Sequence, residues 1–224
     1  MTAVPGYVFD YFRVEKKKDI FTAAGLVVDW LQFTMSPWLS GEAKEVGART
    51  SGYIASAKNA FVWTGLIDDV WDLSSNSYNL IASDADPVLN RVHKAFTSTM
   101  FFSSSCFDAV EQLDVGLKLV DLGRGVSYLQ AGSALTAIFA DVADGIASTI
   151  NLIDGSEDRV RSSLEVTKSV TSIACSIVAL VAIAALIESA LLLTFITLVT
   201  TTVFLAAKIS LYVYNQTFPA PINP

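Results

Sequence analysis

The sequence predicts an all-α protein, a helical bundle that ends in a C-terminal apolar helical hairpin or in one long buried helix. No proline occurs between Pro87 and Pro219, and the alternating apolar and polar residues typical of strands are missing from the same stretch. Glu188 is the only charged residue between Ser169 and Ala207. Apolar residues make up 52% of the chain and charged residues 17%, a composition that excludes intrinsic disorder and indicates a membrane or an unusually buried assembly.

The remaining composition excludes several classes of function. A net charge of −7 argues against nucleic acid as a partner, because phosphate binding needs a basic stripe. Cys106 and Cys175 are too few for a disulfide framework and lack the spacing of zinc ligands. His93 is the single histidine, and no nucleophile or acid stands at a spacing that predicts catalysis with it, so we expect it to be an exposed helical residue. We therefore expect no enzymatic activity and no cofactor.

The N-terminal third predicts two helices. Residues 1–15 have no basic patch followed by an apolar core, so no classical signal peptide is expected. The stretch from Ile20 to Leu39 is interrupted by Asp29 and closed by Pro37, which favours an amphipathic helix over a membrane span. The lysines at 16–18 either contact anionic lipid head groups or form a solvated charge run before a core helix. A second helix is expected over about 51–73, with residues 74–86 as a loop.

Three further helices follow in the middle of the chain. Asp86-Pro87 predicts a helix start, since a carboxylate can cap the helix and proline suits its first position. This helix runs to Leu122 or breaks at the serines 103–105. The next helix closes at Asp154-Gly155 and carries an apolar stripe of Leu135, Ile138, Val142, Ile146, Ile150 and Ile153. Asp141 and Asp144 lie opposite this stripe, and we expect them to face water or another subunit. Ser156 is expected to cap the third helix.

The C-terminal apolar run divides into two lobes. Residues 170–187 and 190–207 each contain 18 residues without a charge, near the lower limit for a membrane span. A hairpin would place Lys168 and Lys208 on one face of a bilayer, in line with the tendency of cations to stay on the cytoplasmic side. Glu188 would then lie at the aqueous tip of the hairpin, or be buried with a partner. The alternative is a long helix, apolar all round, at the centre of a soluble bundle or assembly.

One acidic pattern needs weighing as a metal site. Asp68, Asp69 and Asp72 match the DDxxD pattern with which isoprenoid synthases bind magnesium diphosphate on a helix. The other acidic pairs have the wrong spacing for the second motif that such enzymes carry. We therefore expect a solvated acidic face here, with a magnesium-dependent all-α enzyme as a remote alternative.

The two apolar lobes, 170–187 and 190–207, are separated by a very short polar turn. This arrangement resembles the bilobed hydrophobic segment of chlamydial inclusion membrane proteins. The resemblance implies type III secretion, insertion into a host-derived vacuole membrane and helical regions that serve as scaffolds in the cytosol. The lobes often lie nearer the N-terminus in that group. Type III translocators and peroxisomal membrane-shaping proteins share the same outline.

The sequence thus predicts three regions: an amphipathic helical region over 1–155, an apolar hairpin acting as a membrane anchor over 156–213, and an extended tail over 214–224. The function expected is that of a non-enzymatic, membrane-associated scaffold. Its expected partners are a lipid bilayer, further copies of itself, and other proteins bound through its amphipathic helices. The expected location is a bacterial or host-derived vacuole membrane. The alternative is a soluble, self-assembling subunit of a filament or shell.

Overall fold

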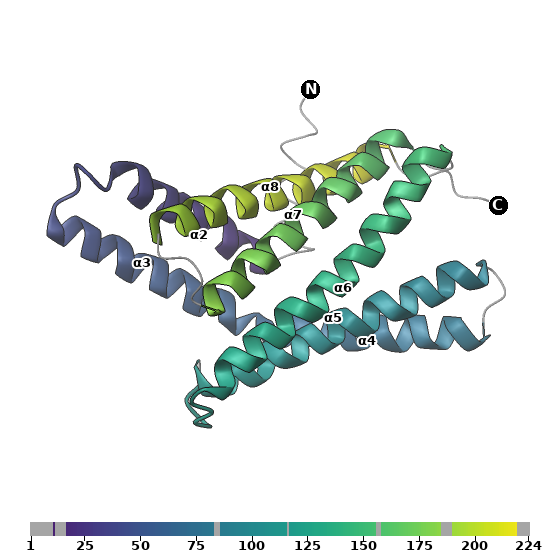
Figure 1. The fold of residues 1–224 in the computed structure, drawn as a ribbon, viewed down its shortest axis with the longest axis horizontal. Coiled ribbons are helices and arrows are strands. Elements are labelled where there is room, and N and C mark those ends of the chain that lie inside the picture. The colour runs from purple at the N-terminus through teal and green to yellow at the C-terminus, as the bar shows by residue number, and fades with distance from the viewer. Residues whose placement is uncertain are drawn as a thin grey trace.

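The computed structural model describes residue 11 and residues 17–82, 86–115, 117–155, 158–184 and 190–218. These residues form seven helices and no strand (Figure 1): α2 (Lys17–Met35), α3 (Gly41–Ala60), α4 (Val62–Ala82), α5 (Val88–Asp114), α6 (Gly125–Asp154), α7 (Arg159–Ile183) and α8 (Ala190–Thr217). The predicted all-α helical bundle is confirmed.

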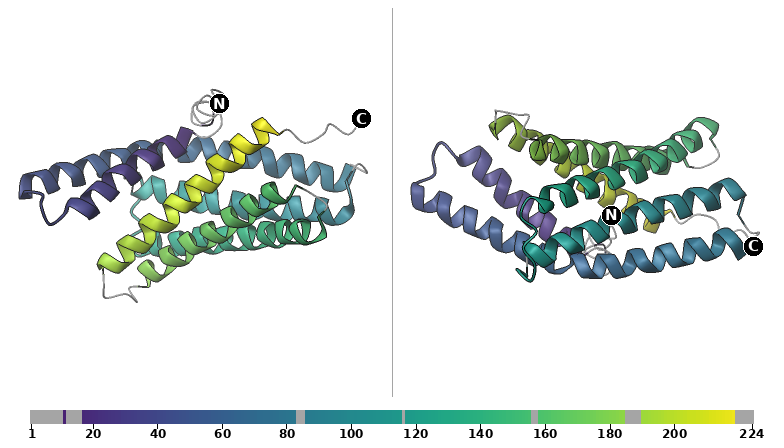
Figure 2. Two further views of the ribbon diagram at one scale, coloured as in Figure 1. Left: turned by 90° about the horizontal axis from the view of Figure 1, so that it is seen from above. Right: turned by 60° about the horizontal axis from the view of Figure 1, so that its bottom comes forward.

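The helices are arranged as an open row. Going along it, α4 packs against α5, α5 against α6, α6 against α7, α7 against α8, α8 against α2, and α2 against α3. Two views in Figure 2 show the α2–α3 pair projecting from one end of the molecule. Such a row gives each inner helix two neighbours and leaves the rest of its surface uncovered, while α3 and α4, at the two ends, also contact each other where one follows the other in the chain.

The apolar run forms two helices, so the alternative of a single long helix is wrong. Helix α7 ends at Ile183, α8 begins at Ala190, and the two pack against each other. Helix α8 continues to Thr217, past residue 213, where the tail was expected to begin. Glu188 and residues 219–224 lie outside the described residues. Helix α6 packs against α7, so the expected boundary at residue 155 is crossed by tertiary contacts.

Of two predicted helix boundaries, one is confirmed and one is wrong. Helix α6 ends at Asp154, and Gly155 adopts a left-handed conformation with φ of 62°, which favours glycine after a helix. Helix α7 is capped by Asp158, whose carboxylate accepts a hydrogen bond of 2.9 Å from the Val160 backbone N–H. The predicted cap, Ser156, is therefore wrong, and Ser156 itself lies outside the described residues.

Three expectations for the first half of the chain are wrong. The region 51–73 is divided between α3 and α4, which are separated at Phe61, and residues 74–82 are helical. Helix α5 passes through the serines 103–105 without a break, because the Ser103 hydroxyl donates to the Thr99 carbonyl at 2.8 Å and so stays compatible with the helix. Helix α5 ends at Asp114 rather than Leu122, and the carboxylate of Asp114 accepts a hydrogen bond of 2.9 Å from the Leu122 N–H.

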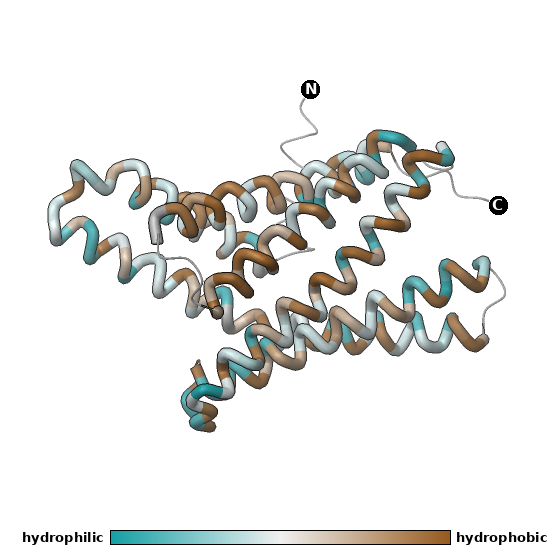
Figure 3. The backbone as a smooth tube through the Cα atoms, viewed as in Figure 1, coloured by the Kyte–Doolittle hydropathy of each residue, from teal (hydrophilic) through white to brown (hydrophobic). Residues whose placement is uncertain are grey.

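Small and polar side chains fill the contacts between helices. Of the nine apolar residues buried in the described part, five are alanines, and eight polar or charged residues are buried with them. Large apolar side chains are exposed along every helix. The interior of an ordinary soluble bundle is instead made of large apolar side chains. Figure 3 shows apolar residues gathered on the ends of α7 and α8 that lie near their connection.

Candidate functional site

The α7–α8 hairpin has a defined antiparallel register. The Cys175 sulfur lies 3.9 Å from the Thr201 hydroxyl, and the Arg161 Nε donates to the Asn215 amide oxygen at 2.9 Å. Lys168 is midway between Cys175 and Arg161 on α7, and Lys208 is midway between Thr201 and Asn215 on α8. The register therefore brings the two lysines to the same level, as the sequence predicted.

On one side of this lysine level the hairpin is polar. The Tyr214 hydroxyl of α8 donates a hydrogen bond to the carboxylate of Asp158 at the start of α7. This bond holds the pKa of the Asp158 carboxyl below its ordinary value, and the Val160 backbone N–H acts in the same direction. Arg161 lies at the same end. This half of the hairpin is therefore built for water or for lipid head groups.

On the other side of the lysine level the hairpin carries no charged residue in 169–184 or 190–207. At about 1.5 Å per residue these segments are ~24 Å and ~27 Å long, close to the ~30 Å of bilayer hydrocarbon. Large apolar side chains on both helices are exposed, among them Ile177, Leu192 and Val203. This half presents an apolar surface that no described residue covers.

Helix α6 has its apolar and polar faces reversed relative to a soluble helix. Five residues of the apolar stripe are exposed: Leu135, Val142, Ile146, Ile150 and Ile153. Asp141, opposite them, is only 3% exposed, and its carboxylate accepts a hydrogen bond of 2.6 Å from Ser172 of α7. The expectation that Asp141 faces water is therefore wrong. An apolar stripe pointing outward and a carboxylate pointing inward is the arrangement expected in lipid.

A second carboxylate of α6 also turns toward a neighbouring helix. Asp144 lies 3.2 Å from the His93 Nε2 of α5, and both side chains are partly buried. The expectation that His93 is an exposed residue is therefore wrong, as is the expectation that Asp144 faces water. The contact holds α5 against α6 at about the level of Lys168, because Gly145, next to Asp144, lies so close to Ser169 of α7 that a Cβ added to the glycine would be 3.4 Å from the serine Cβ.

Serine hydroxyl groups make further hydrogen bonds between α6 and its two neighbours, α5 and α7. Ser148 of α6 donates to Glu165 of α7 at 3.1 Å, and Ser133 of α6 donates to Asp108 of α5 at 2.6 Å. Ser162 and Ser169 of α7 are fully buried as well, but their hydroxyl oxygens have no hydrogen-bond partner among the described residues, so they contribute close packing only. Small hydroxyl residues allow helices to approach closely, and they supply hydrogen bonds between helices where water is scarce.

Three helices in the described part are long and apolar enough to cross a membrane: α6, α7 and α8 over Leu192–Thr217. This property is consistent with a membrane location. The sequence pointed to α7 and α8 through their depletion of charge. It missed α6, because Asp141 and Asp144 made that helix look amphipathic and only the packing shows that both carboxylates have partners.

The acidic pattern on α4 is not gathered into a pocket. Asp69 turns toward α5, where its carboxylate accepts a hydrogen bond from Ser105, whereas Asp68 and Asp72 are exposed. Among the residues that the structure describes, no group of three or more histidine, cysteine, aspartate or glutamate side chains is placed to hold a metal ion. Asp68 and Asp72 therefore lie on an exposed face of α4, and Asp69 contributes to the packing of α4 against α5.

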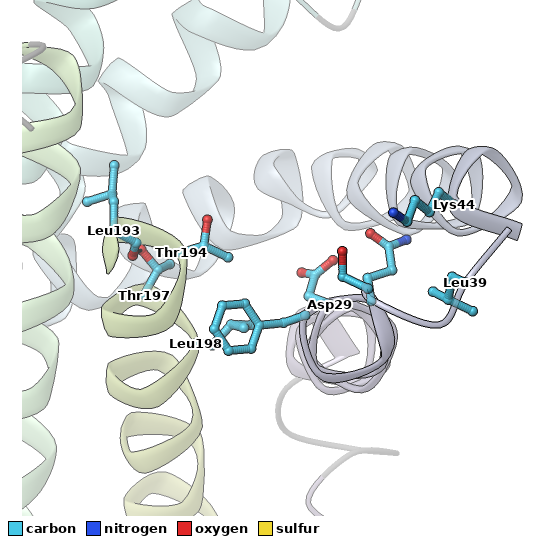
Figure 4. A pocket seen from close by; sticks show the side chains of 10 residues that line it. Asp29, Leu39, Lys44, Leu193, Thr194, Thr197 and Leu198 are labelled. Atoms are coloured by element: carbon cyan, nitrogen blue, oxygen red, sulfur yellow. Dashed lines mark hydrogen bonds between the residues drawn. The ribbon is translucent and has the colours of Figure 1, made fainter. Parts of the chain in front are cut away.

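A groove lies between α2, α3 and the beginning of α8 (Figure 4). Leu193, Thr194, Thr197 and Leu198 form one wall, and Asp29 of α2 with Lys44 of α3 forms part of the other. The Asp29 carboxylate accepts a hydrogen bond of 2.9 Å from Ser51 of α3. The Asp29 carboxylate, one of the polar groups of the groove, therefore helps to hold α2 to α3. The side chains that line the groove do not converge on one point.

No family model, curated protein or solved structure matched this chain.

Proposed function

We propose that this protein is a non-enzymatic, membrane-associated scaffold that is anchored by the α7–α8 hairpin, with α6 beside it in the lipid. The observation that supports this best is the reversal of α6. Its large apolar side chains point outward, and its buried residues are two alanines, Asp141 and Ser148. Exposing such a stripe to water is unfavourable by about 25 cal/mol for each Å², whereas lipid tails remove that cost.

The hairpin also has a preferred direction in a membrane. Arg161, Lys168 and Lys208 all lie at its polar end, together with the ends of α7 and α8 that carry Asp158 and Tyr214. Arginine and lysine next to membrane segments favour the cytoplasmic side. We therefore place the polar end in the cytosol and the short connection between α7 and α8 at the opposite surface of the hydrocarbon.

Flotation of the full chain with liposomes tests the anchor, using one arginine in each half of the hairpin. Val203 on α8 is 40% exposed in the apolar half, and Val160 on α7 is 51% exposed in the polar half. Val203→Arg should weaken membrane binding by up to about 3 kcal/mol, on the order of a hundredfold, because an arginine within the hydrocarbon is expensive. Val160→Arg is the matched control and should float like the parent protein.

Two results would contradict the anchor. One is equal flotation of Val203→Arg and Val160→Arg, which would mean that the apolar half of the hairpin does not enter lipid. The other is a parent protein that stays monodisperse without detergent and does not float, because an exposed surface of this size should not remain soluble on its own.

A second candidate function is self-assembly in water. Apolar residues are exposed outside the hairpin as well, including Trp71, Tyr78 and Ile81 on α4. These side chains could be covered by neighbouring copies in a filament or shell. Regular particles in electron micrographs of detergent-free protein would favour this function over the anchor.

The resemblance to chlamydial inclusion membrane proteins stays a prediction. It agrees with the proposed hairpin anchor, since that group also has two apolar lobes joined by a short turn. Export of the full chain by a type III secretion system, followed by its recovery in a host membrane fraction, would support it.

A further inference from the structure

An apolar groove runs between α8 of the proposed anchor and α2, a helix that the anchor itself does not include. Its α2 wall includes Ala23, Val27, Trp30 and Thr34, and its α8 wall includes Thr202 and Leu205, around a volume of about 410 Å³. No charged side chain lines this α2–α8 groove. Its chemistry suits a hydrocarbon ligand.

Specific contacts hold the two walls together. The Trp30 indole N–H donates to the Thr202 hydroxyl at 3.0 Å, and the Lys208 ammonium donates to the Asp19 carboxylate at 2.6 Å. The Phe195 ring stacks on Phe33 with 5.8 Å between centroids. These contacts make α2 antiparallel to α8, from the lysine level at Asp19 toward the beginning of α8 at Phe33.

The outer face of α2 is apolar along this whole length. Ile20, Val27, Leu31 and Met35 recur at helical spacing and are all exposed. Asp29 is the only charged residue between Ile20 and Met35, and its carboxylate is turned to Ser51 of α3 at 2.9 Å. Helix α2 is not among the described helices that are apolar enough to cross a membrane by composition, because two lysines and two aspartates lie within it.

We propose that the α2–α8 groove binds an acyl chain of a membrane phospholipid, and that the outer face of α2 lies in lipid beside α8. This inference rests on the proposed membrane anchor, because α8 forms one wall. The groove is continuous with the apolar half of α8. The α2 residues that line the groove run from Ala23 to Thr34, ~17 Å at about 1.5 Å per residue, slightly more than the ~15 Å of hydrocarbon in one leaflet. An acyl chain can therefore lie along it.

The four tryptophans of the chain allow a direct test with brominated phosphatidylcholine, because bromine quenches indole fluorescence on contact. In full-length protein reconstituted into vesicles, Trp30 is kept as the only tryptophan by changing Trp38, Trp63 and Trp71 to phenylalanine. Acyl-brominated lipid should quench Trp30 strongly. A chain that keeps only Trp71, exposed on α4 next to Asp72, should lose a much smaller fraction of its emission.

A reporter in α8 separates this inference from the anchor on which it rests. Val203→Trp is placed in a chain whose four native tryptophans are phenylalanine. If Val203→Trp is quenched and Trp30 is not, the α2–α8 groove binds no acyl chain, while the anchor stands. If neither is quenched, the anchor fails as well.

A groove-filling pair tests the groove itself against simple contact of α2 with lipid. Ala23 lines the groove, whereas Ala24 is exposed and does not. Ala23→Phe should lower the quenching of Trp30, and Ala24→Phe should leave it unchanged, with equal helix content by circular dichroism. Thr34→Phe provides a second filler if Ala23→Phe fails to fold. Equal quenching in the filled and control variants would overturn the groove as the binding site.

Discussion

At the scale of single residues, carboxylates that lie between helices are paired with hydroxyl groups of a neighbouring helix, and Asp141 is the buried one of the three. Each aspartate carboxylate accepts a hydrogen bond from one serine hydroxyl: Asp141 from Ser172, Asp108 from Ser133 and Asp69 from Ser105. A buried polar group is expensive unless it is hydrogen-bonded. These pairs therefore fix which face of each helix turns inward, and they do so with side chains that sequence patterns assign to the surface.

The Ser172→Ala substitution tests the most buried of these pairs. It leaves the Asp141 carboxylate without this donor and should lower the free energy of unfolding by about 1–3 kcal/mol. Unfolding by SDS in mixed micelles, followed by circular dichroism, measures the effect. Ser163→Ala, at an exposed position of the same helix, is the control and should change stability little.

The pKa of Asp158 tests the polar end of the hairpin. Tyr214→Phe removes the donor that holds the Asp158 pKa down, so the pKa should rise toward the ordinary value of about 4. Because the native pKa is lowered, ionised Asp158 stabilises the native state above the ordinary pKa, and this contribution is lost as the pH falls through the lowered value. Titration of the carboxyl carbon by NMR measures the shift. An unchanged pKa would contradict the contact, and Tyr128→Phe serves as the control.

At the scale of elements, the hairpin separates its charges by length rather than by face. Along α7 and α8 the charged residues lie toward the ends that hold Asp158 and Tyr214, and the apolar residues lie toward the connection. Helix α6 instead separates its residues by face, with the apolar side outward. Both patterns agree with the proposed membrane location. Charges placed at one end of the hairpin would limit how deeply it inserts, and the apolar outer face of α6 would contact lipid while its polar face packs against α5 and α7.

The hairpin register can be checked with a single introduced cysteine. Cys175 lies 3.9 Å from the Thr201 hydroxyl, so Thr201→Cys should form a disulfide with Cys175 under mild oxidation in a Cys106→Ser background. Mass spectrometry would show the loss of two thiols within one chain. Thr197→Cys, one turn away and exposed, should stay reduced. A disulfide at 197 rather than 201 would mean a shifted register.

At the scale of the whole molecule, the open row of helices lacks a shared hydrophobic core. Each described helix is covered on two sides at most, and large apolar side chains remain exposed from α2 to α8. A soluble domain of this size would close such a row into a bundle to bury that surface. We therefore propose that lipid covers this exposed apolar surface.

Thiol labelling from outside sealed vesicles tests the orientation of the whole molecule. Exposed positions at the polar end, Ser163→Cys on α7 and Ser210→Cys on α8, should react with a membrane-impermeant maleimide from the same side in a chain lacking its native cysteines. Leu192→Cys, in the apolar half, should react only after detergent is added. Labelling of Ser163→Cys and Ser210→Cys from opposite sides would exclude the hairpin orientation.

The sequence by itself determined the all-α class, the division of the apolar run into two helices and the shared level of Lys168 and Lys208. These features depend on the local spacing of apolar residues and on the depletion of charged residues, and both can be read directly from the sequence. Only the tertiary structure decided that Asp141 points inward, that Asp69 is used in packing and that α2 lies on α8. Periodicity shows which residues share a helix face, but what that face meets depends on neighbours distant in sequence, and here the outward faces are the apolar ones.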